Sequence, residues 1–113
     1  VKIFIWNNQG YASIRSMQNN NFGGFQVASG ESSGLSMPDT VKVAAAYGLK
    51  TFRIMDNKQL EQRIEEVLNA EGPVLCELMI SPYETVSPRT KTIVHEDGSM
   101  ESYPLEKMWP CVE

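Results

Sequence analysis

The sequence predicts an α/β fold, in which a parallel sheet has helices on both faces and is followed by an extended C-terminal tail. Three short apolar runs, at residues 1–6, 51–54 and 74–80, have the composition of strands. Between them lie segments whose apolar residues recur at helical spacing. Strands that alternate with helices imply a parallel sheet with right-handed crossovers, and therefore a three-layer αβα arrangement.

The first strand, residues 1–6, is apolar apart from Lys2 and runs directly into Asn-Asn-Gln-Gly at residues 7–10. This order is typical of a strand followed by a turn. Because both faces of the strand are apolar, we expect it to lie inside the sheet and to be covered by helices on both sides.

Residues 11–18 predict a short helix with Ile14 and Met17 on one side. The following stretch, residues 19–34, is polar and rich in Gly, Asn and Ser. Such stretches are usually functional or disordered when they interrupt a compact domain, so we expect a long mobile loop.

A second helix is expected at residues 37–47, with Ser36 as its N-cap, Asp39 in its first turn and Gly48 as its stop. A strand at residues 51–54 follows. The chain therefore returns to the sheet after this helix.

Asp56 is predicted to cap a third helix, which Gly72 and Pro73 end before the last strand. Its apolar stripe has the helical period and consists of Leu60, Ile64, Val67 and Leu68. After residue 80 the periodic pattern stops. We therefore divide the chain into a domain at residues 1–80 and an extended tail at residues 81–113.

The composition excludes several classes of protein. The chain has 113 residues and a net charge of −4, and its ten Lys and Arg residues are scattered, so we expect no nucleic-acid partner. No apolar run approaches the roughly 20 residues of a membrane helix, so we expect no membrane partner. Cys76 and Cys111 are interpreted as reduced thiols of a cytoplasmic protein, with Cys76 in the core.

Other charged residues predict no chemistry of their own. His95 precedes a turn and is expected at the surface, and Arg15 and Arg53 are interpreted as surface charges or ion-pair members. The acidic residues of the third helix form a solvated face.

The informative segment is Asn7-Asn8-Gln9-Gly10-Tyr11, directly after the first strand. Ligands of a doubly wound sheet bind at the carboxyl ends of its strands. Amide and backbone oxygens at such an end suit Mg²⁺, which prefers oxygen ligands and commonly bridges protein to phosphate. Taken alone, these residues favour an Asn-rich turn over a metal site, because Asn and Gly readily accommodate unusual dihedral angles.

Four runs carry a resemblance to a known family: KIFIWNNQGYASIR, SGLSMPDTVKVAAAYGLKTFRI, EGPVLCELMI and DGSMESYPLEKMWP. They resemble the C-terminal part of the diphosphate-binding (PP) domain of thiamine diphosphate-dependent enzymes. Within that family they are most similar to acetolactate synthase large subunits. The resemblance implies that residues 1–80 form a partial thiamine diphosphate-binding fold.

The resemblance also implies which residues form the site. Asn8 matches the family's magnesium ligand, and Gly10 matches the position that gives a backbone carbonyl to the same ion. Tyr11, Ala12 and Ser13 are expected beside the diphosphate. Asn7 is expected to support the loop, and residues 22–25 fall where the family has a substrate-side loop. No catalytic residue is assigned to this chain.

The implied cofactors are thiamine diphosphate and Mg²⁺, and the implied substrate is a 2-oxo acid that is decarboxylated and ligated to an acceptor. Use of FAD cannot be read from these residues. The family's Gly-Asp-Gly, whose Asp is the other protein ligand of the metal, is absent from the sequence, and so is its activating Glu. We therefore expect an inactive fragment of a larger homo-oligomeric enzyme. The alternatives are another family member, such as a 2-oxo acid decarboxylase, or a non-catalytic α/β binding module.

Overall fold

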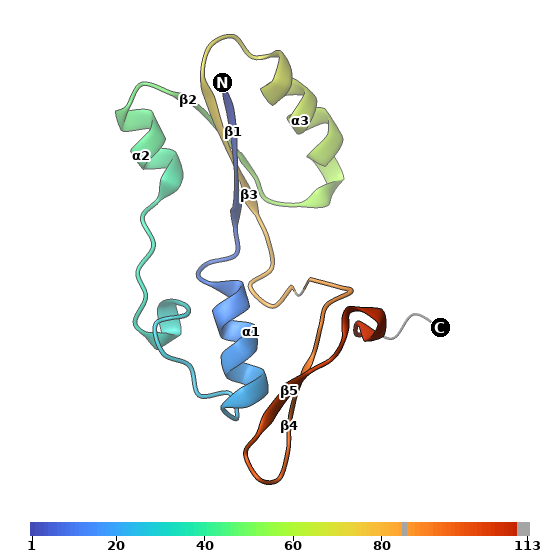
Figure 1. Cartoon of the computed structure of the whole chain (residues 1–113). Coiled ribbons are helices and arrows are strands. Elements are labelled where there is room, and N and C mark those ends of the chain that lie inside the picture. Colours follow the sequence, from blue (N-terminus) through green and yellow to red (C-terminus); the bar gives the residue numbers. More distant parts are fainter. Residues whose placement is uncertain (85, 111–113) are drawn as a thin grey trace.

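The computed structural model describes residues 1–84 and 86–110, and its architecture is α/β (Figure 1). The helices and strands are β1 (Lys2–Asn7), α1 (Ala12–Asn21), α2 (Thr40–Ala46), β2 (Lys50–Ile54), α3 (Leu60–Asn69), β3 (Val74–Met79), β4 (Thr92–Val94) and β5 (Met100–Ser102). Short 3-10 turns lie at Glu31–Ser33, Asn57–Gln59 and Leu105–Lys107. The predicted alternation of strands and helices, and with it the fold class, is confirmed.

The sheet contains β1, β3 and β2 in that order, and both pairings are parallel. The central strand is β3, where Val74 to Glu77 are all buried. The expectation that β1 lies inside the sheet is wrong for the described residues, because β1 is an edge strand and its Trp6 is 74% exposed. An apolar composition on both faces does not by itself distinguish an edge strand from a central one.

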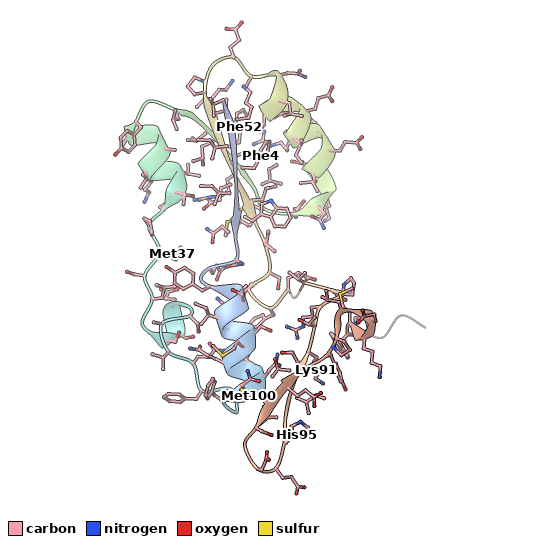
Figure 2. The ribbon with its side chains drawn as sticks, in the orientation of Figure 1. Phe4, Met37, Phe52, Lys91, His95 and Met100 are labelled. Carbon is pink, nitrogen blue, oxygen red and sulfur yellow. The ribbon has the colours of Figure 1, made fainter. Side chains whose placement is uncertain are left out.

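One face of the sheet packs against α3. Val67 of α3 is fully buried against Ile54, Val74 and Cys76. Phe52, labelled in Figure 2, packs on the margin of this cluster. Leu60, Ile64 and Val67 of the predicted apolar stripe therefore face the core, whereas Leu68 is 56% exposed. Cys76 is the buried core thiol that the sequence predicts.

The other face of the sheet packs against α2, which lies on the opposite side from α3 (Figure 1). This helix begins at Thr40 and has Asp39 as its N-cap, whose carboxylate accepts a hydrogen bond from the Lys42 amide at 3.2 Å. The predicted start at residue 37 and the Ser36 cap are wrong. Pro38 disfavours helical dihedral angles at the residue before it, so the helix starts after the proline.

The stretch between α1 and α2 is organised by hydrogen bonds. Ser33 Oγ accepts from the backbone amides of Ser29 and Gly30 at 2.9 and 3.0 Å. Gln18 Nε2 donates to the carbonyl of Val27 at 3.0 Å. The stretch that the sequence predicts as a mobile loop is therefore held together by its own hydrogen bonds. It is also shorter than predicted, because α1 extends to Asn21.

The C-terminal tail contains regular structure that the sequence did not predict. Strands β4 and β5 form an antiparallel hairpin, with His95 near its turn (Figure 2). Arg89 ties the tail to α1, because its Nη1 donates to Ser16 Oγ at 2.6 Å. The boundary between domain and tail after residue 80 stays a prediction.

The described chain is elongated. Its radius of gyration is 18.2 Å, with extents of 57 × 37 × 23 Å. A compact domain of this length has a radius of gyration of about 13 Å. Several large apolar side chains are exposed as a result, including Trp6 on β1. Within residues 1–84 and 86–110, no helix has both the length and the apolar character needed to cross a membrane.

Candidate functional site

The loop that joins β1 to α1 lies at the carboxyl edge of the sheet. The last residue of β1 is held to the neighbouring strand's end, because the Ile80 amide donates to the Asn7 carbonyl at 2.9 Å. Helix α1 begins at Ala12, so the connection is short. The predicted site residues Asn8, Gly10, Tyr11, Ala12 and Ser13 therefore cluster where parallel α/β sheets bind ligands.

Gly10 sits where no other residue fits. Its φ is +149°, and a Cβ atom at this position would lie 2.3 Å from the carbonyl oxygen of Ser29. The next amide, of Tyr11, donates to that same carbonyl at 2.9 Å. Gly10 also forms an isolated bridge with Gly30. The loop is thus held against the 29–30 segment by backbone contact, which requires glycine.

Asn7 supports the loop from inside. Its Oδ1 accepts a hydrogen bond from the Gln9 amide at 2.9 Å, and its Nδ2 donates to Glu77 Oε1 at 2.8 Å. Both ends of this amide are therefore engaged within the protein. Asn7 has the loop-supporting role that the resemblance implies. The side chain of Asn8, in contrast, makes no hydrogen bond within residues 1–84 and 86–110.

Asn8 and Gly10 carry oxygens of the chemical kind that hard cations bind. Among the described residues, no hydrogen bond uses the Asn8 side chain or the Gly10 carbonyl. No group of three or more His, Cys, Asp and Glu side chains in residues 1–84 and 86–110 forms a metal cluster. A cation at this loop would thus be held by amide and backbone oxygens, which are ligands that Mg²⁺ accepts.

The N-terminus of α1 fits an anion. The amides of its first turn have no intrahelical acceptor, which leaves those of Ala12, Ser13 and Ile14 available. The N-cap residue Tyr11 makes no side-chain cap, and no acidic residue lies in the first turn. Backbone amides and the helix dipole at such an end attract phosphate groups.

Arg15 is a functional candidate that the sequence analysis misplaced. It was expected to be a surface charge or an ion-pair member, but it is only 6% exposed and makes no ion pair among the described residues. Its guanidinium instead donates to backbone carbonyls of the loop. Its position in the first turns of a helix is the feature that indicates a contact with the preceding loop, because helical side chains point back toward the helix N-terminus.

Glu77 is a second residue that the sequence analysis missed. It is 1% exposed and accepts hydrogen bonds from Asn7 and, at 2.6 Å, from Thr40 Oγ1. Arg53 Nε donates to its other oxygen, and Arg53 Nη2 pairs with Asp39 Oδ1 at 2.9 Å. The ion-pair interpretation of Arg53 is therefore confirmed. The sequence feature that indicates buried polar partners for Glu77 is its carboxylate in the middle of an apolar strand.

These contacts keep Glu77 ionised. Burial raises the pKa of its carboxyl, but the hydrogen bonds from Thr40, Asn7 and Arg53, together with the charge of Arg53, outweigh burial and leave the pKa below its usual range. A buried carboxylate with this many donors is stable as an anion. Ionised Glu77 thereby fixes the side chain of Asn7, which supports the β1–α1 loop.

Two other predicted features lie away from the loop. Residues 22–25, which the resemblance places near the substrate, follow the C-terminal end of α1. That end is about 15 Å from the loop, since a helix of ten residues rises 1.5 Å per residue. His95 lies in the hairpin and approaches Glu101 at 3.3 Å.

Comparison with known sequences identifies the family. The profile of the family described as thiamine pyrophosphate enzyme, C-terminal TPP binding domain, matches residues 1–78. The chain belongs to this family of α/β cofactor-binding domains.

Its relatives include acetolactate synthases from distant organisms. The acetolactate synthase large subunit of Cyanidium caldarium is 31% identical over 88 residues, which is 78% of this chain and 15% of the relative. The probable large subunit of Methanocaldococcus jannaschii is 32% identical over 76% of the chain and 14% of its own length. The isozyme 2 large subunit of Escherichia coli is 29% identical over 96% of the chain and 18% of its own length. The chain therefore spans less than a fifth of these relatives.

Proposed function

We propose that this chain contributes part of the magnesium and diphosphate site of a thiamine diphosphate-dependent, acetolactate synthase-like enzyme. The observation that carries the proposal is the β1–α1 loop. There the oxygens of Asn8 and Gly10 and the first amides of α1 lie together at the carboxyl edge of the sheet. A cation and a phosphate group could be held side by side by such an arrangement.

The proposed roles follow from the atoms that are left available. Asn8 Oδ1 and the Gly10 carbonyl would hold Mg²⁺, while the amides of Ala12 and Ser13, with Tyr11 beside them, would hold the diphosphate. Thiamine diphosphate, when bound, supplies a carbanion and an electron sink for the chemistry of 2-oxo acids. We assign no catalytic residue to this chain, and its part is to bind and orient.

The activity is proposed for a larger homo-oligomeric protein in which this chain is one part. Support comes from the small share of each relative that the chain covers, 15% for the subunit of Cyanidium caldarium. The exposed apolar side chains of β1 also favour further packing. The proposed reaction is decarboxylation of a 2-oxo acid followed by carboligation, classed as a transferase or lyase reaction. The chain alone is expected to be inactive, and a cytoplasmic location is proposed from the unpaired Cys76.

The decisive experiment compares Asn8→Ala with the wild type in the complete protein. Calorimetric titration with thiamine diphosphate and Mg²⁺ should show binding by the wild type and a loss of at least tenfold in the variant. Asn69→Ala, at the exposed end of α3, is the control and should bind normally. Absence of binding by the wild type would instead favour the non-catalytic α/β module.

The substrate is tested separately. The complete protein supplied with pyruvate should form acetolactate. A protein that binds the cofactor and releases carbon dioxide without acetolactate would be another family member, such as a 2-oxo acid decarboxylase.

A further inference from the structure

We propose that Arg15 is a positioning residue, whose buried guanidinium holds the 8–10 loop in the conformation that leaves the Gly10 carbonyl available to the metal. This inference rests on the proposed function, because it concerns the same loop. It assigns a role to a residue that touches neither the cation nor the diphosphate in the proposed arrangement.

The first support is the environment of the charge. The Arg15 side chain is 6% exposed, and no carboxylate pairs with it among the described residues. Burying a charged group is costly unless its donors are hydrogen-bonded. Its partners are therefore the reason that a guanidinium is accommodated here.

Those partners are backbone carbonyls from three segments. Arg15 Nη2 donates to Gln9 and Ser29 carbonyls at 3.2 Å each, and more weakly to the Asn8 carbonyl at 3.5 Å. Its Nη1 donates to the carbonyl of Pro82, directly after the sheet. One planar group thus joins the loop, the 29–30 segment and the start of the tail.

The hydrogen bonds from Arg15 distinguish the Gly10 carbonyl from the other two carbonyls of the 8–10 loop. The carbonyls of Asn8 and Gln9 are turned toward Arg15, whereas that of Gly10 accepts no hydrogen bond within residues 1–84 and 86–110. Gln9 adopts a φ of +59°, a left-handed conformation that few non-glycine residues adopt without support. The hydrogen bond from Arg15 to the Gln9 carbonyl provides such support.

The guanidinium also fills a slot between two glycines. A Cβ atom on Gly10 would lie 2.7 Å from Arg15 Nη2, and one on Gly30 would lie 3.1 Å from it. The backbone can approach this closely only because both residues lack side chains. A lysine, which is a compact point charge on a flexible stem, cannot reproduce a flat fork that reaches several carbonyls.

The sign of the effect distinguishes positioning from simple electrostatics. A positive charge near a bound cation repels it, so removing Arg15 would strengthen metal binding if charge were its main contribution. Removing a positioning residue weakens metal binding instead, by about 10–100-fold for groups that orient metal ligands. The two roles therefore predict opposite changes in the same quantity.

The experiment uses Arg15→Gln and Arg15→Lys in the complete protein, with Arg63→Gln as a control. Arg63 pairs with Glu66 on α3, on the far side of the sheet from α2. Mn²⁺, which prefers the same oxygen ligands as Mg²⁺, is titrated by electron paramagnetic resonance in the presence of thiamine diphosphate. We expect binding at least tenfold weaker in Arg15→Gln, a smaller loss in Arg15→Lys, and no change in the control.

A second readout needs no cofactor. The amide of Tyr11, bonded to the Ser29 carbonyl, should exchange its hydrogen faster in Arg15→Gln than in the wild type or the control. Unchanged or tighter Mn²⁺ binding in Arg15→Gln would overturn the inference. If that variant does not fold, wild-type affinity in Arg15→Lys overturns it. A wild type that binds no Mn²⁺ refutes the proposed function itself, whereas a binding wild type with unaffected variants refutes only the role of Arg15.

Discussion

Asn7 donates a hydrogen bond from its side-chain amide to the carboxylate of Glu77 at 2.8 Å, which joins the end of β1 to the buried centre of β3. The same carboxylate receives Thr40 from α2 and Arg53 from β2. The loop that follows Asn7 is therefore fixed to three other elements through one side chain. Rigid elements hold a binding site more precisely than an isolated loop does, because each supporting side chain is itself fixed.

Glu77→Gln should destabilise the fold by about 2 kcal/mol, because charge-assisted hydrogen bonds in a buried site are lost. The partial exposure of Arg53, 39% for its side chain, limits the cost, since water compensates the guanidinium. Urea denaturation measures the difference. Thr40→Val is the matched variant, and it should cost less because it removes only one of the hydrogen bonds to the carboxylate and leaves the others in place. Equal costs for the two variants would contradict a central role for the charge.

The stabilising effect of Glu77 should depend on pH. Its pKa in the folded protein lies below the usual value of 4.5, so ionised Glu77 contributes its full stability above pH 4.5. This contribution is lost as the pH falls through the lower, folded-state pKa. The difference in unfolding free energy between wild type and Glu77→Gln should therefore shrink as the pH falls below 4.5. A constant difference down to pH values where the wild type begins to unfold would show that the charge is not responsible.

Gly10→Ala should disrupt the loop and weaken binding of metal and diphosphate. The new Cβ would lie 2.3 Å from the Ser29 carbonyl, which no rotamer relieves. Gly34→Ala is the control, since Gly34 also has a positive φ, +90°, but no atom lies within 4 Å of the added carbon. The control isolates the dihedral cost, about 1 kcal/mol. Thermal unfolding and titration with cofactor measure both effects, and equal behaviour of the two variants would refute the steric argument.

Local sequence patterns predicted the elements of the fold well. The stripe of α3 and the apolar runs of the strands required only periodicity, which depends on neighbours along the chain. The position of β1 at the sheet edge and the hairpin at residues 92–102 depend on pairing partners that no local pattern identifies. The start of α2 at Thr40 could have been predicted by giving more weight to Pro38.

The candidate site was likewise predicted only in part from the sequence. The position of the loop after a strand drew attention to it, but Asn8 and Gly10 were assigned to the site through the family resemblance. Its supports, Arg15 and Glu77, were not found, because their partners lie up to 70 residues away along the chain, as for Asn7 and Glu77. A charged residue within an apolar strand, or in the first turns of a helix, indicates that a polar partner lies nearby in the fold. The sequence does not identify which residue that partner is.

Val67→Ala should destabilise the domain by about 2 kcal/mol, which combines lost apolar burial with the cavity left behind. Val67 is fully buried between α3 and the sheet. Leu68, the next residue, is 56% exposed, and Leu68→Ala should cost clearly less despite removing more atoms. Chemical denaturation of both variants tests whether α3 is oriented as described. A larger cost at Leu68 would require a helix rotated on the sheet, or a further partner over that face.

Cys76 should resist alkylation in the folded protein. The thiol is fully buried in the cluster beneath α3. Burial raises its pKa above the usual range, although the charge of Arg63 opposes this in part. Because the thiolate is the reactive form, both access and ionisation disfavour reaction. Mass spectrometry after iodoacetamide treatment near pH 8 should find Cys76 unmodified in the native protein and modified after unfolding in urea. Rapid native modification would mean that α3 opens from the sheet faster than a core helix should, and would move Val67 out of the stable core as well.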